Sequence, residues 1–133
     1  MPDRPVRRAS CSCGQLRLVA HGDSIRISMC HCLACQRRTG SVFGAQARFQ
    51  ASAVRTEGRW TEYRRLSDEG EERTYAFCPD CGSTVFYRLA SLPDVVAVPV
   101  GAFADPTFPA PWVSVWESSR HPWVSVPEGA QRD

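Results

Sequence analysis

The stretch "MCHCLACQRRTG" at residues 29–40 places Cys30, Cys32 and Cys35 within six positions, with His31 between the first two. Thiols spaced this closely either bind a metal, react, or lie together by chance. The chain has seven cysteines in total, and an odd number cannot pair completely as disulfides. In a reducing compartment metal ligation is the better explanation for so many thiols, so the other four cysteines decide how this stretch is interpreted.

Those four cysteines form two further pairs, Cys11-x-Cys13 and Cys78-x-x-Cys81. Residues two apart on a strand point to the same face, so the first pair can offer two sulfurs from an extended backbone. The second pair lies in "FCPDCGS" at 77–83, where Pro-Asp makes a bend and glycine lets the chain leave it, as in a zinc knuckle. Together the pairs predict a closed, structural four-thiolate site. The alternatives are buried free cysteines that pack as small apolar residues, or an iron-sulfur cluster.

Three cysteines then remain for a second site, and three protein ligands with one open position are typical of a catalytic or ligand-exchanging zinc. His31 points away from the face that Cys30 and Cys32 share, so it is expected to hydrogen-bond to the backbone rather than to bind metal. An alternative stays open: His21 or His121 could supply a fourth ligand and make the site structural.

The segment "QRRTGS" at 36–41 follows the cluster, and its composition suits either an anion-binding turn or a solvated one. Trp112, Trp116 and Trp123 are expected to pack in the core rather than to form a ligand platform.

Short apolar segments rich in valine and aromatic residues, separated by ten prolines and nine glycines, predict a mostly β fold of short antiparallel sheets in one domain. Only short helical turns are expected near 33–38 and 50–54. The domain is predicted at 10–126, with flexible ends at 1–9 and 127–133. The predicted strands are 15–20, 24–29, 41–49, 61–65, 72–77, 83–89, 94–103 and 112–117.

The charge pattern does not fit a nucleic-acid-binding surface. All 16 basic residues are arginine, and they are dispersed along the chain beside 14 acidic residues instead of clustering on one face. The formal net charge of +2 falls to about −1 if the thiolates hold two divalent metals. No pattern in the chain predicts an oligomeric state.

No segment approaches the roughly 18 apolar residues of a membrane helix, and the polar beginning, "MPDRPVRRAS", is not followed by the apolar part of a signal peptide. We therefore expect a soluble, cytoplasmic protein without membrane contacts.

The ordered set of motifs resembles the family of glutathione-dependent formaldehyde-activating enzymes and centromere protein V. The resemblance extends from about residue 10 to residue 126. One departure is His121 before Pro122 and Trp123, where the family more often has a small or apolar residue. The matching segments are "CSCGQLRL" at 11–18, "CHCLACQRRTGS" at 30–41, "FCPDCGS" at 77–83, "VPVGAF" at 98–103 and "SSRHPW" at 118–123.

The resemblance implies a β-tent fold with two zinc ions: a structural ion on Cys11, Cys13, Cys78 and Cys81, and an exchangeable ion on Cys30, Cys32 and Cys35, which are also the expected catalytic residues. It further implies a carbon-sulfur lyase whose partners are a small thiol and an aldehyde, such as glutathione and formaldehyde giving S-hydroxymethylglutathione. The alternative function is a non-catalytic, zinc-stabilised module that binds another protein, to which the tryptophan-rich end would contribute.

Overall fold

The structure is a computed structural model that describes residues 4–133. Strands dominate it, and its single α-helix in that range has seven residues. The elements are β1 (Val6–Ser10), β2 (Arg17–His21), β3 (Arg26–Cys30), α1 (Leu33–Thr39), β4 (Gly44–Gln50), β5 (Val54–Glu57), β6 (Thr61–Leu66), β7 (Glu72–Phe77), β8 (Thr84–Leu89), β9 (Val95–Pro99), β10 (Val113–Val115) and β11 (Gln131–Arg132), with 3-10 turns η1 (Ala51–Ala53), η2 (Val100–Phe103) and η3 (Glu117–Ser119).

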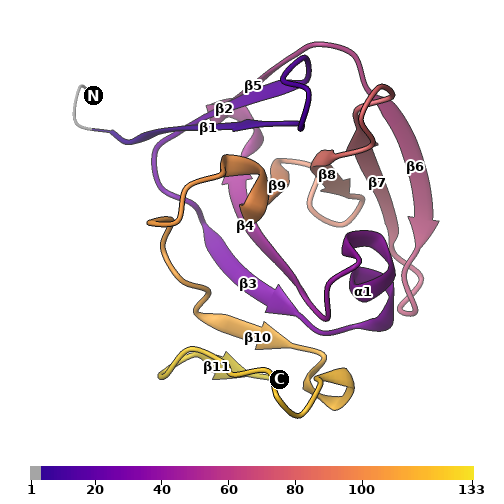
Figure 1. The fold of residues 1–133 in the computed structure, drawn as a ribbon, viewed down its shortest axis with the longest axis vertical. Coiled ribbons are helices and arrows are strands. Elements are labelled where there is room, and N and C mark those ends of the chain that lie inside the picture. The colour runs from indigo at the N-terminus through magenta and orange to yellow at the C-terminus, as the bar shows by residue number, and fades with distance from the viewer. Residues whose placement is uncertain (1–3) are drawn as a thin grey trace.

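The strands form two sheets. The larger has the order β11-β10-β3-β4-β9-β8-β7-β6, and the smaller has the order β1-β2-β5. Every neighbouring pair is antiparallel except those of β10, which runs parallel to both β3 and β11. The large sheet curls, so that α1 lies between the ends of β3 and β4 and the hairpin of β6 and β7 (Figure 1). The prediction of a mostly β fold is confirmed.

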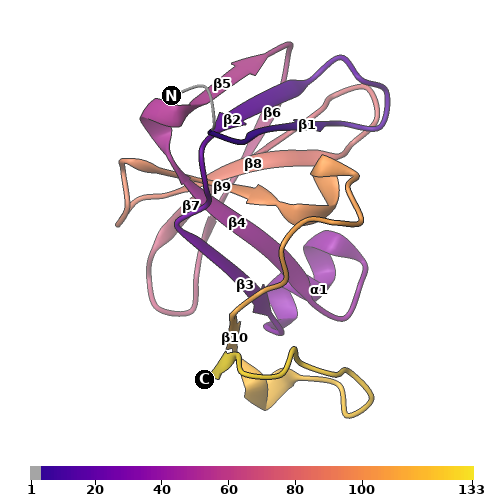
Figure 2. The ribbon, with the colours of Figure 1, turned by 90° about the vertical axis from the view of Figure 1, so that its left-hand side faces the viewer.

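The main core lies between the two sheets, which cross one another in Figure 2. Leu18 and Ala20 face it from β2, and Phe49, Val96 and Val98 face it from β4 and β9. Along β2 these side chains alternate with less buried residues, as in a half-buried strand, whereas the middle of β9 is buried on both faces. Full burial of one such large apolar side chain is worth about 1.5–3 kcal/mol, so this layer holds the small sheet against the large one.

The opposite face of the large sheet carries a second, smaller cluster. Tyr75, Tyr87 and Ala97 lie side by side on β7, β8 and β9, and all are buried. The same row continues through the strand pairs to Arg48 and Arg26 on β4 and β3, which face each other directly. This aromatic and cationic face is the one that α1 and the β6–β7 hairpin enclose.

The helix α1 begins and ends on side-chain and backbone caps. The Cys32 sulfur accepts a hydrogen bond from the Cys35 N–H at 3.3 Å, which caps the N-terminus. Gly40 ends the helix in the left-handed conformation, with φ of 75°, and its N–H donates to the Gln36 carbonyl at 2.8 Å. A left-handed glycine is a common helix terminator, and the short helix at 33–38 is as predicted.

Both ends of the chain carry strands that the sequence did not predict. Four of the five residues of β1 fall in the segment 1–9 that was expected to be flexible, and the strand pairs with β2 over its whole length. β11 falls within 127–133 and extends β10. Residues 1–3 lie outside the described part of the chain, and the domain limits at 10 and 126 stay predictions.

Within residues 4–133, no helix is long and apolar enough to cross a membrane.

Candidate metal centres and the pocket beside them

Four cysteines from two hairpin turns converge on one point, here called the four-cysteine site. Cys11 and Cys13 lie in the turn between β1 and β2, and Cys78 and Cys81 lie in the turn between β7 and β8. The four sulfurs lie within 4.8 Å of one another. The sequence placed Cys11 and Cys13 on an extended strand, but both follow β1 and belong to its turn, so the two pairs approach as two facing knuckles.

The spacing of the sulfurs fits a tetrahedral metal. The Cys13 sulfur lies 3.6 Å from that of Cys11 and 3.7 Å from that of Cys78. Four sulfurs each about 2.3 Å from a central zinc would lie about 3.8 Å apart. A disulfide requires a sulfur–sulfur distance of about 2.05 Å, and all seven cysteines are free. The four-cysteine site therefore has the geometry to hold a metal ion.

Hydrogen bonds prepare two of these sulfurs, those of Cys78 and Cys81, to act as thiolates. The Gln15 amide donates to the Cys78 sulfur at 3.0 Å, and the Asp80 backbone N–H lies 3.4 Å from the same sulfur. Backbone hydrogen bonds, chiefly from Ser83, lower the pKa of Cys81 to about 5. Donors aimed at a ligating sulfur stabilise its charged form, which is the form that binds metal.

The remaining cysteines meet at the junction of β3 and α1, here called the three-cysteine site. Cys30 ends β3, Cys32 caps α1, and Cys35 lies in its first turn. Their sulfurs also lie within 4.8 Å of one another. Cys30 and Cys35 are buried, whereas Cys32 is partly exposed, so the site opens to its surroundings on the Cys32 side.

The pKa values of Cys30 and Cys35 are shifted in opposite directions. A side-chain hydrogen bond from Cys30 and the nearby Arg38 guanidinium together lower the pKa of Cys35 to about 5. The same hydrogen bond and burial raise the pKa of Cys30. The three-cysteine site therefore holds a thiolate next to a fixed cation.

No histidine completes the three-cysteine site among residues 4–133. The His121 Nε2 atom pairs with the Gln36 side-chain oxygen at 3.1 Å, and His21 ends a strand of the small sheet. The buried His31 is turned away from the sulfurs, as predicted, but its partner is the Ser114 hydroxyl at 2.9 Å instead of the backbone. Neither His21 nor His121 is among the ligand atoms that converge.

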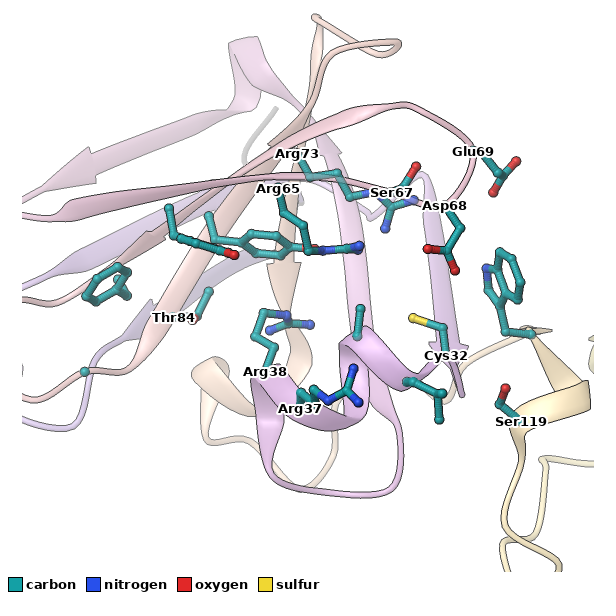
Figure 3. Close-up of a pocket in the computed structure, with 17 residues that line it drawn as sticks. Cys32, Arg37, Arg38, Arg65, Ser67, Asp68, Glu69, Arg73, Thr84 and Ser119 are labelled. Atoms are coloured by element: carbon teal, nitrogen blue, oxygen red, sulfur yellow. The ribbon is translucent and has the colours of Figure 1, made fainter.

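A pocket of about 800 Å³ opens beside the three-cysteine site (Figure 3). The Cys32 sulfur points into the space between α1 and the β6–β7 hairpin, and Cys32 is the cysteine that lines the pocket. This volume lies within the range of small-molecule sites, roughly 300–1,000 Å³. The other lining residues are Leu33, Ala34, Arg37, Arg38, Tyr63, Arg65, Ser67, Asp68, Glu69, Arg73, Tyr75, Phe77, Gly82, Thr84, Trp116 and Ser119.

The pocket is predominantly cationic. Arg37 and Arg38 face it from α1, and Arg65 and Arg73 face it from the hairpin (Figure 3). The first two belong to the segment 36–41 for which the sequence left an anion-binding turn open, and the structure brings both to the pocket. The hairpin arginines were not foreseen, since only the pairing of β6 with β7 brings them opposite α1.

Arg38 is held against two aromatic rings. Its guanidinium carbon lies 5.1 Å from the ring centroid of Tyr75 and 5.5 Å from that of Tyr87, within the range of cation–π contacts. Burial raises the pKa of Tyr87, so this ring stays neutral. Arg38 is thus positioned between the tyrosines and the Cys35 thiolate.

The prediction that three tryptophans pack in the core is wrong. Trp112, Trp116 and Trp123 are 50%, 39% and 71% exposed, and none belongs to either buried cluster. All three follow the proline-rich connection 103–111. This part of the chain runs along one edge of the large sheet. Only Trp116 lines the pocket.

Comparison with known proteins agrees with this geometry. A family model described as glutathione-dependent formaldehyde-activating enzyme matches residues 6–119, which confirms the resemblance to that family noted in the sequence. A solved structure of a Rhodobacter sphaeroides protein superposes with a TM-score of 0.58 at 20% identity, covering 77% of this chain and 90% of that one. That likeness concerns the fold alone. No curated protein sequence matches the chain.

Proposed function

Because the chain belongs to the family of glutathione-dependent formaldehyde-activating enzymes, we propose that it is a zinc-dependent carbon-sulfur lyase. In the synthetic direction it joins a small thiol to an aldehyde, as when glutathione and formaldehyde give S-hydroxymethylglutathione. The single observation that carries this proposal is the partly exposed Cys32 sulfur, which belongs to a three-thiol cluster and faces a cationic pocket.

We assign two zinc ions to the two cysteine clusters. Zinc suits soft thiolate ligands and needs no assembly machinery. The four-cysteine site is closed by four sulfurs and is structural. The three-cysteine site leaves one position open, at which a bound zinc would supply a place for the substrate sulfur to be held as a thiolate. Free thiols in both sites match a reducing compartment such as the cytoplasm.

The reaction needs no oxidant or reductant. A carbon–sulfur bond forms as the thiol sulfur attacks the carbonyl carbon, the carbonyl π electrons move to oxygen, and the thiol proton ends on that oxygen. In the reverse direction the same bond breaks and the sulfur leaves as thiolate. The residues of the chain contribute by position and charge: Arg38 offsets the negative charge of the Cys35 thiolate, so that a further thiolate is repelled less.

The pocket's charges match a thiol of the glutathione type, which carries two carboxylates and one ammonium group. Four arginines line the pocket, and an arginine can donate two parallel hydrogen bonds to one carboxylate. Asp68 and Glu69 lie in the loop of the β6–β7 hairpin and line the same pocket, where either carboxylate can bind the ammonium group. Thiols that lack these charges are expected to bind more weakly.

Exchange NMR tests the proposed activity, because thiols and formaldehyde already equilibrate without a catalyst. At equilibrium with glutathione and ¹³C-formaldehyde, the zinc-loaded wild-type protein should accelerate exchange between free formaldehyde and the hydroxymethyl adduct. Cys32→Ser should return the exchange to the uncatalysed rate while the protein spectrum stays folded. A wild-type protein that leaves the exchange rate unchanged would instead favour the non-catalytic binding module.

A further inference from the structure

Trp116 has a backbone conformation that few large residues adopt. Its φ and ψ are 58° and 44°, in the left-handed region, and Trp116 and Ala104 are the non-glycine residues with positive φ in residues 4–133. The Cβ atom of an L-residue crowds the following carbonyl in this region, so a bulky residue there is strained. The strain persists only where the surrounding structure imposes it.

Contacts on both sides of Trp116 impose this conformation. The preceding residue, Val115, pairs with Cys30, and its carbonyl accepts the His31 N–H at 3.0 Å. The following residue, Glu117, receives the Arg132 guanidinium at 2.8 Å. Further donors to that carboxylate are the Ser114 hydroxyl and the Arg120 guanidinium. Because the backbone is held on both sides of Trp116, the direction of the indole is restricted.

The strained conformation of Trp116 does not serve to pack its side chain into either buried cluster. The Trp116 side chain is absent from both, and it is 39% exposed. It lines the pocket together with Cys32 and Leu33, and Leu33 is itself an exposed apolar residue. A strained aromatic residue that leaves the core and borders a pocket indicates a contact with a ligand.

We propose that Trp116 is a specificity-determining residue of the three-cysteine site. Its indole and Leu33 form an apolar wall that packs against the amide-bearing carbon skeleton of the bound thiol, and this selects a peptide thiol over a small one. The inference rests on the proposed function, since it requires that a thiol binds at the three-cysteine site.

The test compares two thiols and two tryptophans in the zinc-loaded protein. Trp116→Asn removes the indole and places a residue that tolerates the left-handed region. Trp123→Asn is the matched control, because Trp123 is exposed and does not line the pocket. Trp116→Phe keeps an aromatic wall. Dissociation constants for glutathione and 2-mercaptoethanol are measured by calorimetry, and thermal midpoints by circular dichroism.

We expect Trp116→Asn to weaken glutathione binding about tenfold, as loss of roughly 55 Å² of apolar contact would. Binding of 2-mercaptoethanol should change less than about twofold, since it reaches little of the wall. The thermal midpoint should stay at or above that of the wild type because strain is relieved, and Trp116→Phe should retain most of the affinity for glutathione. Trp123→Asn should bind both thiols as the wild type does.

Two results would overturn the inference while leaving the proposed function intact: unchanged glutathione affinity in Trp116→Asn, or a lowered midpoint with both thiols weakened alike, which marks a structural role. A wild-type protein that binds neither thiol would sink the proposed function, and the inference with it. The behaviour of the wild type therefore separates the two failures.

Discussion

Arg38 connects the three-cysteine site to the pocket. Its guanidinium lies near the Cys35 thiolate, and its Nε atom is buried without a hydrogen-bond partner in residues 4–133. Contacts with Tyr75 and Tyr87 hold the group in place. Because Arg38 also lines the pocket, its guanidinium is well placed to attract an anionic substrate toward the thiolate cluster.

Substitution of Arg38 should therefore affect substrate binding more than folding. In Arg38→Gln we expect the dissociation constant for glutathione to rise about tenfold, equivalent to about 1.4 kcal/mol, as measured by calorimetry on the zinc-loaded protein. The matched control is Arg64→Gln, because Arg64 is exposed on β6 and does not line the pocket. An equal loss in both variants would mean that overall charge, and not the position of Arg38, sets the affinity.

For single residues, the sequence predicts the cysteine groups better than it predicts the residues that line the pocket. Cysteine spacing alone sorts the seven thiols into the two groups that converge, because a knuckle is a local feature. Arg73 and Tyr75 reach the pocket only through strand pairing, and Trp116 reaches it only through its unusual backbone. None of these effects leaves a signal in neighbouring residues.

Among the elements, the junction of β3 and α1 positions the three-cysteine site. The strand ends at Cys30, the helix begins after Cys32, and seven residues later Gly40 ends it. A helix this short gains little from propensity alone, so its caps carry much of its stability. Anything that prolongs or unwinds α1 also moves Cys35 and both helix arginines.

Gly40→Ala should destabilise this junction through the backbone. A Cβ atom at Gly40 would meet no neighbour within 4 Å, but φ is 75°, and an L-residue in the left-handed region costs about 1–2 kcal/mol. We expect the free energy of unfolding to fall by about that amount in denaturant titrations. Gly101→Ala is the control, since Gly101 also has open space but no positive φ. A similar loss of stability in Gly101→Ala would contradict the view that the left-handed conformation of Gly40 causes the effect.

Strand prediction succeeded where side chains alternate clearly and failed on short or polar strands. The predicted range 72–77 coincides with β7, and 83–89 differs from β8 by one residue. β5 was missed because its sequence, "VRTE", has a single large apolar residue, and β11 has only two residues. Such strands form because a neighbouring edge offers hydrogen bonds, which the local sequence does not encode.

In the whole molecule, the four-cysteine site joins the two sheets. Cys11 and Cys13 belong to the small sheet's hairpin, and Cys78 and Cys81 belong to a hairpin of the large sheet. A metal at this site would close a loop of more than 60 residues, given the 65-residue separation between Cys13 and Cys78. Closing so long a loop restricts the unfolded chain strongly.

If each cysteine site holds a zinc ion, as proposed, the two sites should respond differently to the loss of one cysteine. Cys78→Ser should lose several kcal/mol of folding free energy and unfold when a chelator removes the metal. Cys32→Ser should remain folded, with one zinc instead of two and no thiol binding. Circular dichroism with zinc analysis measures both properties. If the two variants unfold alike, the division into a structural and an exchangeable site is incorrect.

The global topology was the least predictable level. The β10 strand pairs in parallel with β3 across more than 80 residues, and this contact brings Trp116 to the pocket. Parallel pairing of distant segments depends on how the whole chain packs, whereas β6 and β7 follow one another in the chain and pair as a hairpin. The sequence therefore predicts the cysteine clusters and many of the strands, but not the arrangement that encloses the pocket.

Zinc X-ray absorption with and without glutathione tests the central claim most directly. The protein should contain two zinc ions per chain, with an average of about 3.5 sulfur neighbours per zinc from one four-thiolate and one three-thiolate site. Saturating glutathione should raise the average to about 4, as the light-atom ligand of the three-cysteine site is replaced by sulfur. A single zinc per chain, or a sulfur count that glutathione leaves unchanged, would contradict the account.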